Sequence, residues 1–163
     1  MPEDVFDPYA LLQALERHRV FYVVVGALGR VLHGSDEVTD GLDIVPSTRE
    51  ENLRRLGLAL DDLNARRPDG RRPELGRKPV VELQTDAGQL KVVVEPAGTR
   101  GYDDLRRRAS RQPLGRGLRP QVASLDDHAR MLAALDREQD RQPLRTIRRV
   151  IELDHRLGRA IER

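Results

Sequence analysis

An apolar run of strand length that ends at a glycine constrains the fold of this chain more than any other segment. Residues 20–25 read Val-Phe-Tyr-Val-Val-Val, and Gly26 and Ala27 follow. An uninterrupted apolar run rich in β-branched residues is typical of a strand covered on both faces. Gly26 permits a sharp turn and the close approach of a ligand. We predict a short helix over residues 27–33, whose first amides could hold a phosphate; a plain strand-to-helix turn is the alternative.

A second predicted strand, residues 39–45, begins with acidic residues and reads Thr-Asp-Gly-Leu-Asp-Ile-Val. Side chains two apart on a strand share a face, so Thr39, Gly41 and Asp43 lie together if the strand is regular. A carboxylate that projects from a strand end towards a phosphate-binding turn suits magnesium, which proteins hold with one or two carboxylates plus substrate phosphates. Asp43 is therefore the central candidate residue of the chain.

The remaining segments alternate between helical and strand patterns, which indicates an α/β (α+β) fold with helices over a sheet and with C-terminal helices. Predicted helices cover residues 8–19, 47–63, 102–110, 124–135 and 143–161, and further strands cover 80–84, 89–95 and 118–123. Ser47 and Glu50 predict a capping box, and Pro120 predicts that the last strand is an edge strand. For 163 residues we expect one domain, with its core over 1–123 and a helical part over 124–163.

Composition excludes some classes of site and leaves others open. The chain has no cysteine, which excludes disulfides and thiolate metal sites. It has no long apolar run, so we expect a cytoplasmic protein with no membrane partner. Of the 29 basic residues, 27 are arginine, and the net charge is +2. Arginine suits bidentate phosphate contacts, but this overall charge does not by itself indicate a nucleic acid partner.

Two basic segments are candidates for RNA contact. Residues 65–78 form a predicted loop with six cationic and two anionic side chains. Residues 100–119 carry seven arginines, and within them the predicted RNA-binding residues are Arg106, Arg107, Arg108 and Arg111. Each segment has two interpretations: a surface that binds phosphates, or an ordinary solvated loop or helix face.

Six short motifs follow one another along the chain: Val-Gly-Ala at 25–27, Leu-His-Gly-Ser at 32–35, Thr-x-x-Leu-Asp-Ile-Val-Pro at 39–46, Leu-Lys-Val-Val-Val-Glu-Pro-Ala-Gly at 90–98, Tyr-Asp-Asp-Leu at 102–105 and Val-Ala-Ser-Leu-Asp-Asp at 122–127. Their order and spacing resemble the nucleotidyltransferase superfamily, the minimal polymerase-β-like fold, which implies a mixed sheet flanked by helices. They resemble most closely the AbiEii/MenAT-type toxins of prokaryotic toxin–antitoxin systems. The resemblance spans roughly residues 18–135.

The resemblance implies an enzyme that transfers a nucleoside monophosphate from a nucleoside triphosphate (NTP) to RNA, with the 3′ acceptor end of tRNA as the expected target. The implied partners are the NTP, tRNA or another RNA, and a cognate antitoxin. Gly26, Ala27 and Arg30 would bind the nucleotide. Asp43, with Asp40, would bind Mg²⁺ or Mn²⁺. The predicted catalytic residues are Asp43, Lys91 and Thr39.

Several positions depart from the pattern of the superfamily. Ala27 replaces the second glycine or serine of the turn, Gly41 replaces the first acid of the acid–apolar–acid pair, and Lys91 stands where a third acid is common. Gly41 either leaves the site broken for paired metal ions or forms a bulge that re-aims Asp40 into the site. Lys91 either pairs with Asp43, or contacts a phosphate or helps to activate the acceptor hydroxyl.

Three functions are therefore open. The first is the RNA-modifying enzyme. The second is a catalytically impaired protein of the same fold that binds a nucleotide, an RNA or a partner protein, which the loss of two acids favours. The third is a structural or interaction module with an unused pocket.

Overall fold

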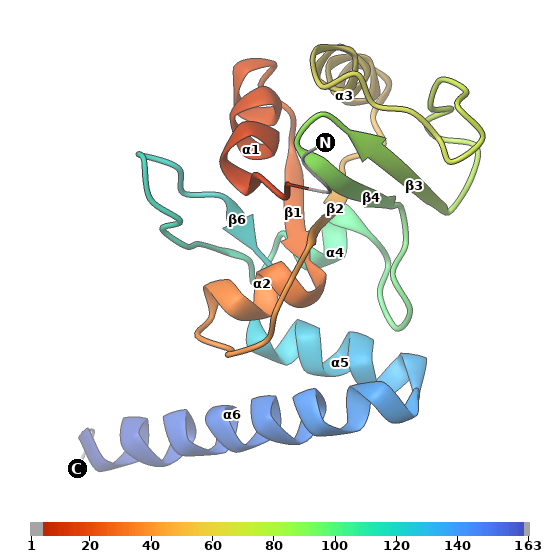
Figure 1. Cartoon of the computed structure of the whole chain (residues 1–163). Coiled ribbons are helices and arrows are strands. Elements are labelled where there is room, and N and C mark those ends of the chain that lie inside the picture. Colours follow the sequence, from red (N-terminus) through yellow and green to blue (C-terminus); the bar gives the residue numbers. More distant parts are fainter. Residues whose placement is uncertain (1–4, 162–163) are drawn as a thin grey trace.

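The computed structural model describes residues 5–161, and within them the chain forms a six-stranded mixed sheet with helices packed on it (Figure 1). The strands are β1 (Tyr22–Val25), β2 (Gly41–Pro46), β3 (Val80–Thr85), β4 (Gly88–Val93), β5 (Ser110–Arg111) and β6 (Gln121–Val122). Their order across the sheet is β3-β4-β2-β1-β6-β5. The pairs β2–β4 and β1–β6 are parallel, and the others are antiparallel. The predicted fold class is confirmed.

The helices are α1 (Pro8–Arg17), α2 (Gly26–Leu32), α3 (Glu50–Asp62), α4 (Tyr102–Leu105), α5 (Leu125–Leu135) and α6 (Arg141–Ile161), with a 3-10 helix η1 (Glu138–Asp140) before α6. The Asp7 side chain accepts from Ala10 N–H at the start of α1, and Ser124 Oγ accepts from Asp127 N–H at the start of α5; both are N-caps. Figure 1 shows α6 as a long helix that runs below α5 at the bottom of the view. Within residues 5–161, no helix is long and apolar enough to cross a membrane.

Period-two alternation along the strands supplies two cores, one on each face of the sheet. The first core packs against α1 and α3 and includes Tyr22, Val24, Leu42, Ile44, Leu90 and Val92. The second core packs against α4 and α5 and includes Val23, Val25, Val45, Leu105 and Met131. On the face of the second core, Glu82 and Gln84 of β3 and Gln89 of β4 are exposed. That part of the sheet is therefore available to form a site.

A buried asparagine joins α3 to the start of β1. Asn52 accepts from the Phe21 N–H at 2.7 Å, and its amide donates to Phe21 O at 2.9 Å and to Ser47 O at 2.7 Å. The residue is 4% exposed. Buried polar groups need such partners, because an unmade hydrogen bond costs the full desolvation of the group. Asn52 thus holds α3 in place against the sheet.

Of the two interpretations of Gly41, the strand pairing contradicts the bulge. β2 and β4 pair in continuous register, with Gly41 opposite Gln89 and Asp43 opposite Lys91. A bulge would place two residues of one strand against one of the other. The regular ladder keeps Gly41 and Asp43 on one face, and Asp40 precedes the strand.

Three local predictions are also wrong. β6 lies inside the sheet, between β1 and β5, because Pro120 precedes the strand and removes no ladder hydrogen bond from it. The helix predicted over 102–110 ends at Leu105, and residues 110–111 form β5. Helix α3 has Arg49 as its N-cap, without a side-chain cap bond; Ser47 Oγ instead accepts from the Arg49 N–H at 3.5 Å.

Candidate functional site

A cavity of about 480 Å³ lies where the start of β2 meets β4 and β3. Its lining residues come from both motifs singled out in the sequence and from the hairpin: Ala27, Thr39, Asp40, Gly41, Asp43, Pro68, Glu82, Leu83, Gln84, Gln89, Leu90 and Lys91. The structure therefore brings together five of the predicted site residues, namely Ala27, Thr39, Asp40, Asp43 and Lys91. Glu82, Gln84 and Gln89 were missed by the sequence analysis, although the register of the predicted hairpin could have shown that Glu82 lies opposite Lys91.

Gly26 and Asp43 face each other at the edge of this cavity. Val25 is paired with Asp43 across the antiparallel strands β1 and β2, and α2 begins at the next residue. Gly26 has φ +70°, and a Cβ at this position would lie 2.5 Å from Asp43 Oδ2 and 3.0 Å from its Cγ. The glycine is needed both for its backbone conformation and for the close approach of the carboxylate. The predicted meeting of the glycine turn with Asp43 is present.

The Asp43 carboxyl is partly buried, and burial raises its pKa above the ordinary value. The charges of Lys91 and Arg30 act in the opposite direction, and Glu82 adds to the rise. Burial disfavours the charged form of an acid, whereas a nearby cation favours it. The result is a carboxylate that is more basic than one in water.

Three charged side chains form a row across neighbouring strands. Asp43 on β2 is in register with Lys91 on β4, and Lys91 is in register with Glu82 on β3. We call Asp43, Lys91 and Glu82 the charged row. Lys91 Nζ lies 3.9 Å from Glu82 Oε1. The ion pair of Lys91 within 4.0 Å is thus with Glu82, not with Asp43 as one interpretation of the sequence predicted.

Gly41 and Thr39 complete the β2 side of the cavity. A Cβ at Gly41 would meet Gln89 Cβ and Gln89 O at 3.4 Å each, which is close to ordinary van der Waals contact. No feature of its backbone requires a glycine. Thr39 Oγ1 donates to Gly41 O at 3.0 Å, so its side chain braces the entry to β2.

The residues present do not fit the paired metal ions that the resemblance implies. Within residues 5–161, no group of three or more His, Cys, Asp or Glu side chains is placed to hold a metal ion. Asp43 has a lysine beside it on the next strand and a glycine two residues before it. Asp40 lines the cavity but is exposed. Paired ions need several carboxylate oxygens gathered at one point.

Arg30, predicted to bind the nucleotide, is held by another residue. Its Nε and Nη2 donate to the two carboxylate oxygens of Glu37, both at 2.8 Å. This bidentate pair, the strongest type of ion pair, also holds the pKa of Glu37 below its ordinary value. Arg30 lines a separate cavity of about 390 Å³ beside α6 and reaches Asp43 through its charge.

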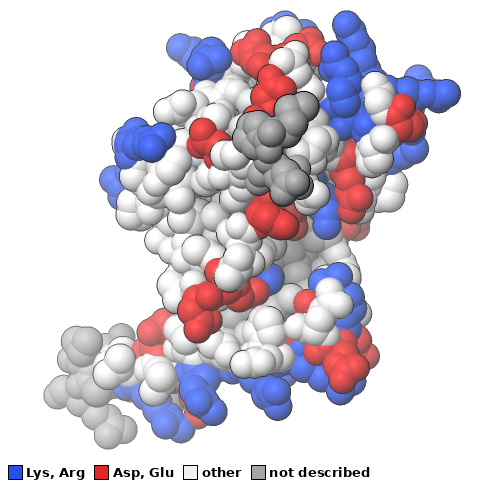
Figure 2. Space-filling model, in the orientation of Figure 1, with Lys and Arg blue, Asp and Glu red and all other residues white. Residues whose placement is uncertain are grey.

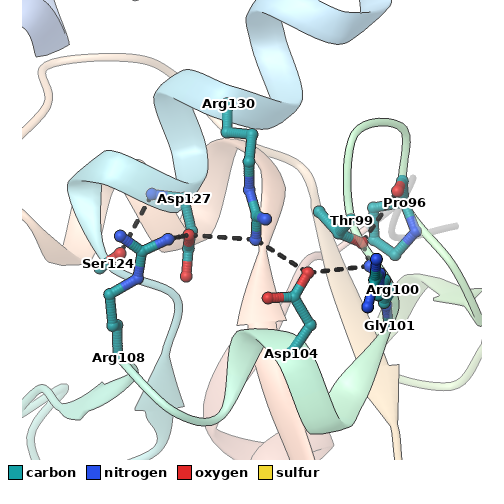
Figure 3. A network of polar contacts seen from close by, with 9 residues as sticks. All are labelled: Pro96, Thr99, Arg100, Gly101, Asp104, Arg108, Ser124, Asp127 and Arg130. Carbon is teal, nitrogen blue, oxygen red and sulfur yellow. Dashed lines mark hydrogen bonds and ion pairs between the residues drawn. The ribbon is translucent and has the colours of Figure 1, made fainter.

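The four arginines predicted to bind RNA lie outside the lining of the main cavity. Arg108 pairs with the fully buried Asp127, which Arg130 also contacts at 3.2 Å; Arg130 in turn contacts Asp104 at 3.0 Å (Figure 3). These ion pairs join α4, the following turn and α5.

The other three of these arginines are spread over the surface near β5 and α4. Arg106 pairs with Asp103 at 3.2 Å, and Arg111 Nη1 donates to Arg119 O at 3.1 Å. Arg107 lines a separate hollow that it shares with Arg130 and Asp104.

The arginine-rich loop over residues 65–78 lies beside the main cavity. Pro68 lines the cavity, and Arg66 forms a bridge with Gln84 of β3 through backbone hydrogen bonds of 2.9 and 2.8 Å. Figure 2 shows basic side chains gathered at the upper right of the molecule, where Figure 1 places this loop. Positive charge therefore lies close to the cavity mouth.

A comparison of the sequence with protein-family models and with curated proteins yields no match. Among solved structures, the chain is similar to the lincosamide antibiotic adenylyltransferase LnuA, determined with lincomycin bound, with a TM-score of 0.63 and 15% identity over 90% of this chain and 98% of LnuA. It is also similar to TM1012, a candidate nucleotidyltransferase from Thermotoga maritima, with a TM-score of 0.55 and 15% identity over 99% of this chain and 98% of that one. The chain thus has the fold of the nucleotidyltransferases.

Proposed function

We propose that this chain transfers a nucleoside monophosphate from an NTP to an acceptor hydroxyl, with the reaction centred on Asp43. The observation that carries the proposal is the position of Asp43, which faces the Gly26 turn at the edge of one cavity that Lys91 and Thr39 also line. The nucleotidyltransferase fold supports the same class of reaction, although fold alone does not determine function.

In this proposal the acceptor oxygen attacks the α-phosphorus, the bond from that phosphorus to pyrophosphate breaks, and the acceptor proton passes to the Asp43 carboxylate. The raised pKa of Asp43 suits a general base. The Lys91 ammonium meets the negative charge of the phosphates, as fixed cations do in phosphoryl transfer. The arginines of loop 65–78 would add positive charge at the cavity mouth, where an anionic acceptor enters.

An RNA acceptor, such as the 3′ end of tRNA, is supported by the motif resemblance to AbiEii/MenAT-type toxins and by the arginine-rich loop beside the cavity. The same resemblance suggests a toxin that is neutralised by a cognate antitoxin. We expect expression of the chain alone to arrest growth, and expression of Asp43→Asn not to do so. Equal arrest by both proteins would contradict a toxin that acts through this site.

A second candidate is a protein that binds the nucleotide without transferring it. Gly41 and Lys91 favour it, because they remove two acids from the site and the structure supplies no bulge that would replace them. Nucleotide binding needs the cavity and its cations but no base. An assay that measures both nucleotide binding and label transfer distinguishes the two candidates.

The test uses purified protein, each NTP labelled at the α-phosphate, and bulk tRNA, with parallel samples in Mg²⁺, Mn²⁺ and a chelator. Label on RNA supports transfer, and we expect Asp43→Asn to reduce it by at least about 100-fold, the lower range for loss of a general base. Nucleotide binding without label transfer supports the second candidate. Absence of both binding and transfer with all four NTPs would refute both.

A further inference from the structure

Lys91 is placed between two carboxylates on the floor of the main cavity. It stands on β4, the middle of three neighbouring strands, with Asp43 in register on one side and Glu82 on the other. Asp40 adds a third carboxylate to the lining, and Lys91 is the one cationic residue among the described residues that line the cavity. Without Lys91, these acids would line one cavity with no cationic side chain among its lining residues.

We infer that the Lys91 ammonium occupies the place of a divalent cation in this cavity: it balances the carboxylates of the charged row and keeps metal ions out. The inference goes beyond the proposed function and does not depend on whether a nucleotide is transferred. It accounts for the presence of one lysine among the three acids that line this cavity.

The chemistry of the two kinds of cation supports the replacement of a divalent ion by the Lys91 ammonium. A single divalent ion is usually held by one or two carboxylates together with several waters, and Asp43, Asp40 and Glu82 all line this cavity. The ammonium of Lys91 would compete with such an ion for these carboxylates. An ammonium is a compact charge on a flexible stem and needs no fixed ligand set. It also repels a second cation a few ångströms away.

The geometry of Lys91 permits this role. Its side chain is 41% exposed, so the ammonium stays hydrated at the cavity floor while it lies 3.9 Å from Glu82 Oε1. Its charge also holds the pKa of Asp43 below the level that burial alone would produce. Lys91 therefore acts on carboxylates from both neighbouring strands.

The test measures Mn²⁺ binding to the full chain by the loss of the free Mn²⁺ signal in electron paramagnetic resonance, with no nucleotide or RNA present. Lys91→Met keeps an unbranched side chain that is one atom shorter and removes its charge, whereas Lys91→Arg is the matched control that keeps the charge. We expect Lys91→Met to bind Mn²⁺ at least about tenfold more tightly than the original chain, because the carboxylates lose their counter-charge. Lys91→Arg should behave like the original chain.

A second substitution identifies where the ion binds. Adding Asp43→Asn to Lys91→Met should abolish the gain in Mn²⁺ binding. The inference is overturned if the original chain binds Mn²⁺ as tightly as Lys91→Met, or if Lys91→Met and a second neutral variant, Lys91→Gln, both fold by circular dichroism and gain no binding. Because the Mn²⁺ assay contains no nucleotide or RNA, a negative result in it contradicts the role of Lys91 and says nothing about nucleotide transfer.

Discussion

The contact between Gly26 and Asp43 can be tested by adding one methyl group. In Gly26→Ala the new Cβ would lie 2.5 Å from Asp43 Oδ2, 3.0 Å from Cγ and 3.2 Å from Cβ. Rotation of the aspartate moves the first two atoms but not its Cβ, so the backbone of β2 must also shift. We expect this overpacking to cost about 1–3 kcal/mol, in addition to about 1–2 kcal/mol for alanine in the left-handed region.

Gly117→Ala is the matched control for this experiment. Gly117 has φ +77°, close to the φ of +70° at Gly26, but a Cβ there would meet no atom within 4 Å. It therefore incurs only the backbone cost of about 1–2 kcal/mol. Urea unfolding followed by circular dichroism gives the free energy of unfolding of both variants, and Gly26→Ala should lose about 1–3 kcal/mol more than Gly117→Ala.

A double-mutant cycle locates the source of that difference. Asp43→Ala removes Cγ and Oδ2, so Gly26→Ala should be less destabilising in its presence, with a coupling of about 1 kcal/mol. Equal losses of stability in Gly26→Ala and Gly117→Ala, or additive losses in the cycle, would refute the placement of Asp43 against the turn. The proposed site would then lose its central contact.

Two further predictions concern the stability of the fold around the site. Asn52→Ala should lower the free energy of unfolding by about 2 kcal/mol, since it leaves the Phe21 N–H and the Ser47 carbonyl without the Asn52 side chain as partner. Urea unfolding measures this, and an unchanged midpoint would contradict it. Burial lowers the pKa of His128 from 6.5 to about 3. Below pH 6.5 the unfolded chain therefore binds a proton that the folded chain does not. The contribution of His128 to the free energy of unfolding is fully present above pH 6.5 and is lost as the pH falls towards 3. The loss from His128 should reach about 2 kcal/mol at pH 5. His128→Leu should flatten the stability profile between pH 7 and 5, and an unchanged slope would show that His128 titrates normally.

Local patterns predicted the elements that build the site. The apolar run before Gly26, the alternation around Asp43 and the turn between β3 and β4 each depend on neighbours in the sequence, and all three are present. The same alternation placed Gly41 and Asp43 on one face. Pairing between distant strands was less accessible. The hairpin register can place Glu82 opposite Lys91, but the parallel pairing of β2 with β4, which places Asp43 on the other side of Lys91, joins segments far apart in the sequence.

The sequence by itself determined the strands and the turn that form the backbone of the site, because the spacing of apolar residues and the position of a glycine fix local backbone structure over a few residues. The tertiary structure decided which charges meet. Arg108 is bound to Asp127, 19 residues further along the chain, and Arg30 lines a cavity separate from the one that Lys91 lines. An ion pair depends on which segments pack together, and arginines of similar local sequence have no pattern that distinguishes a buried partner from open solvent.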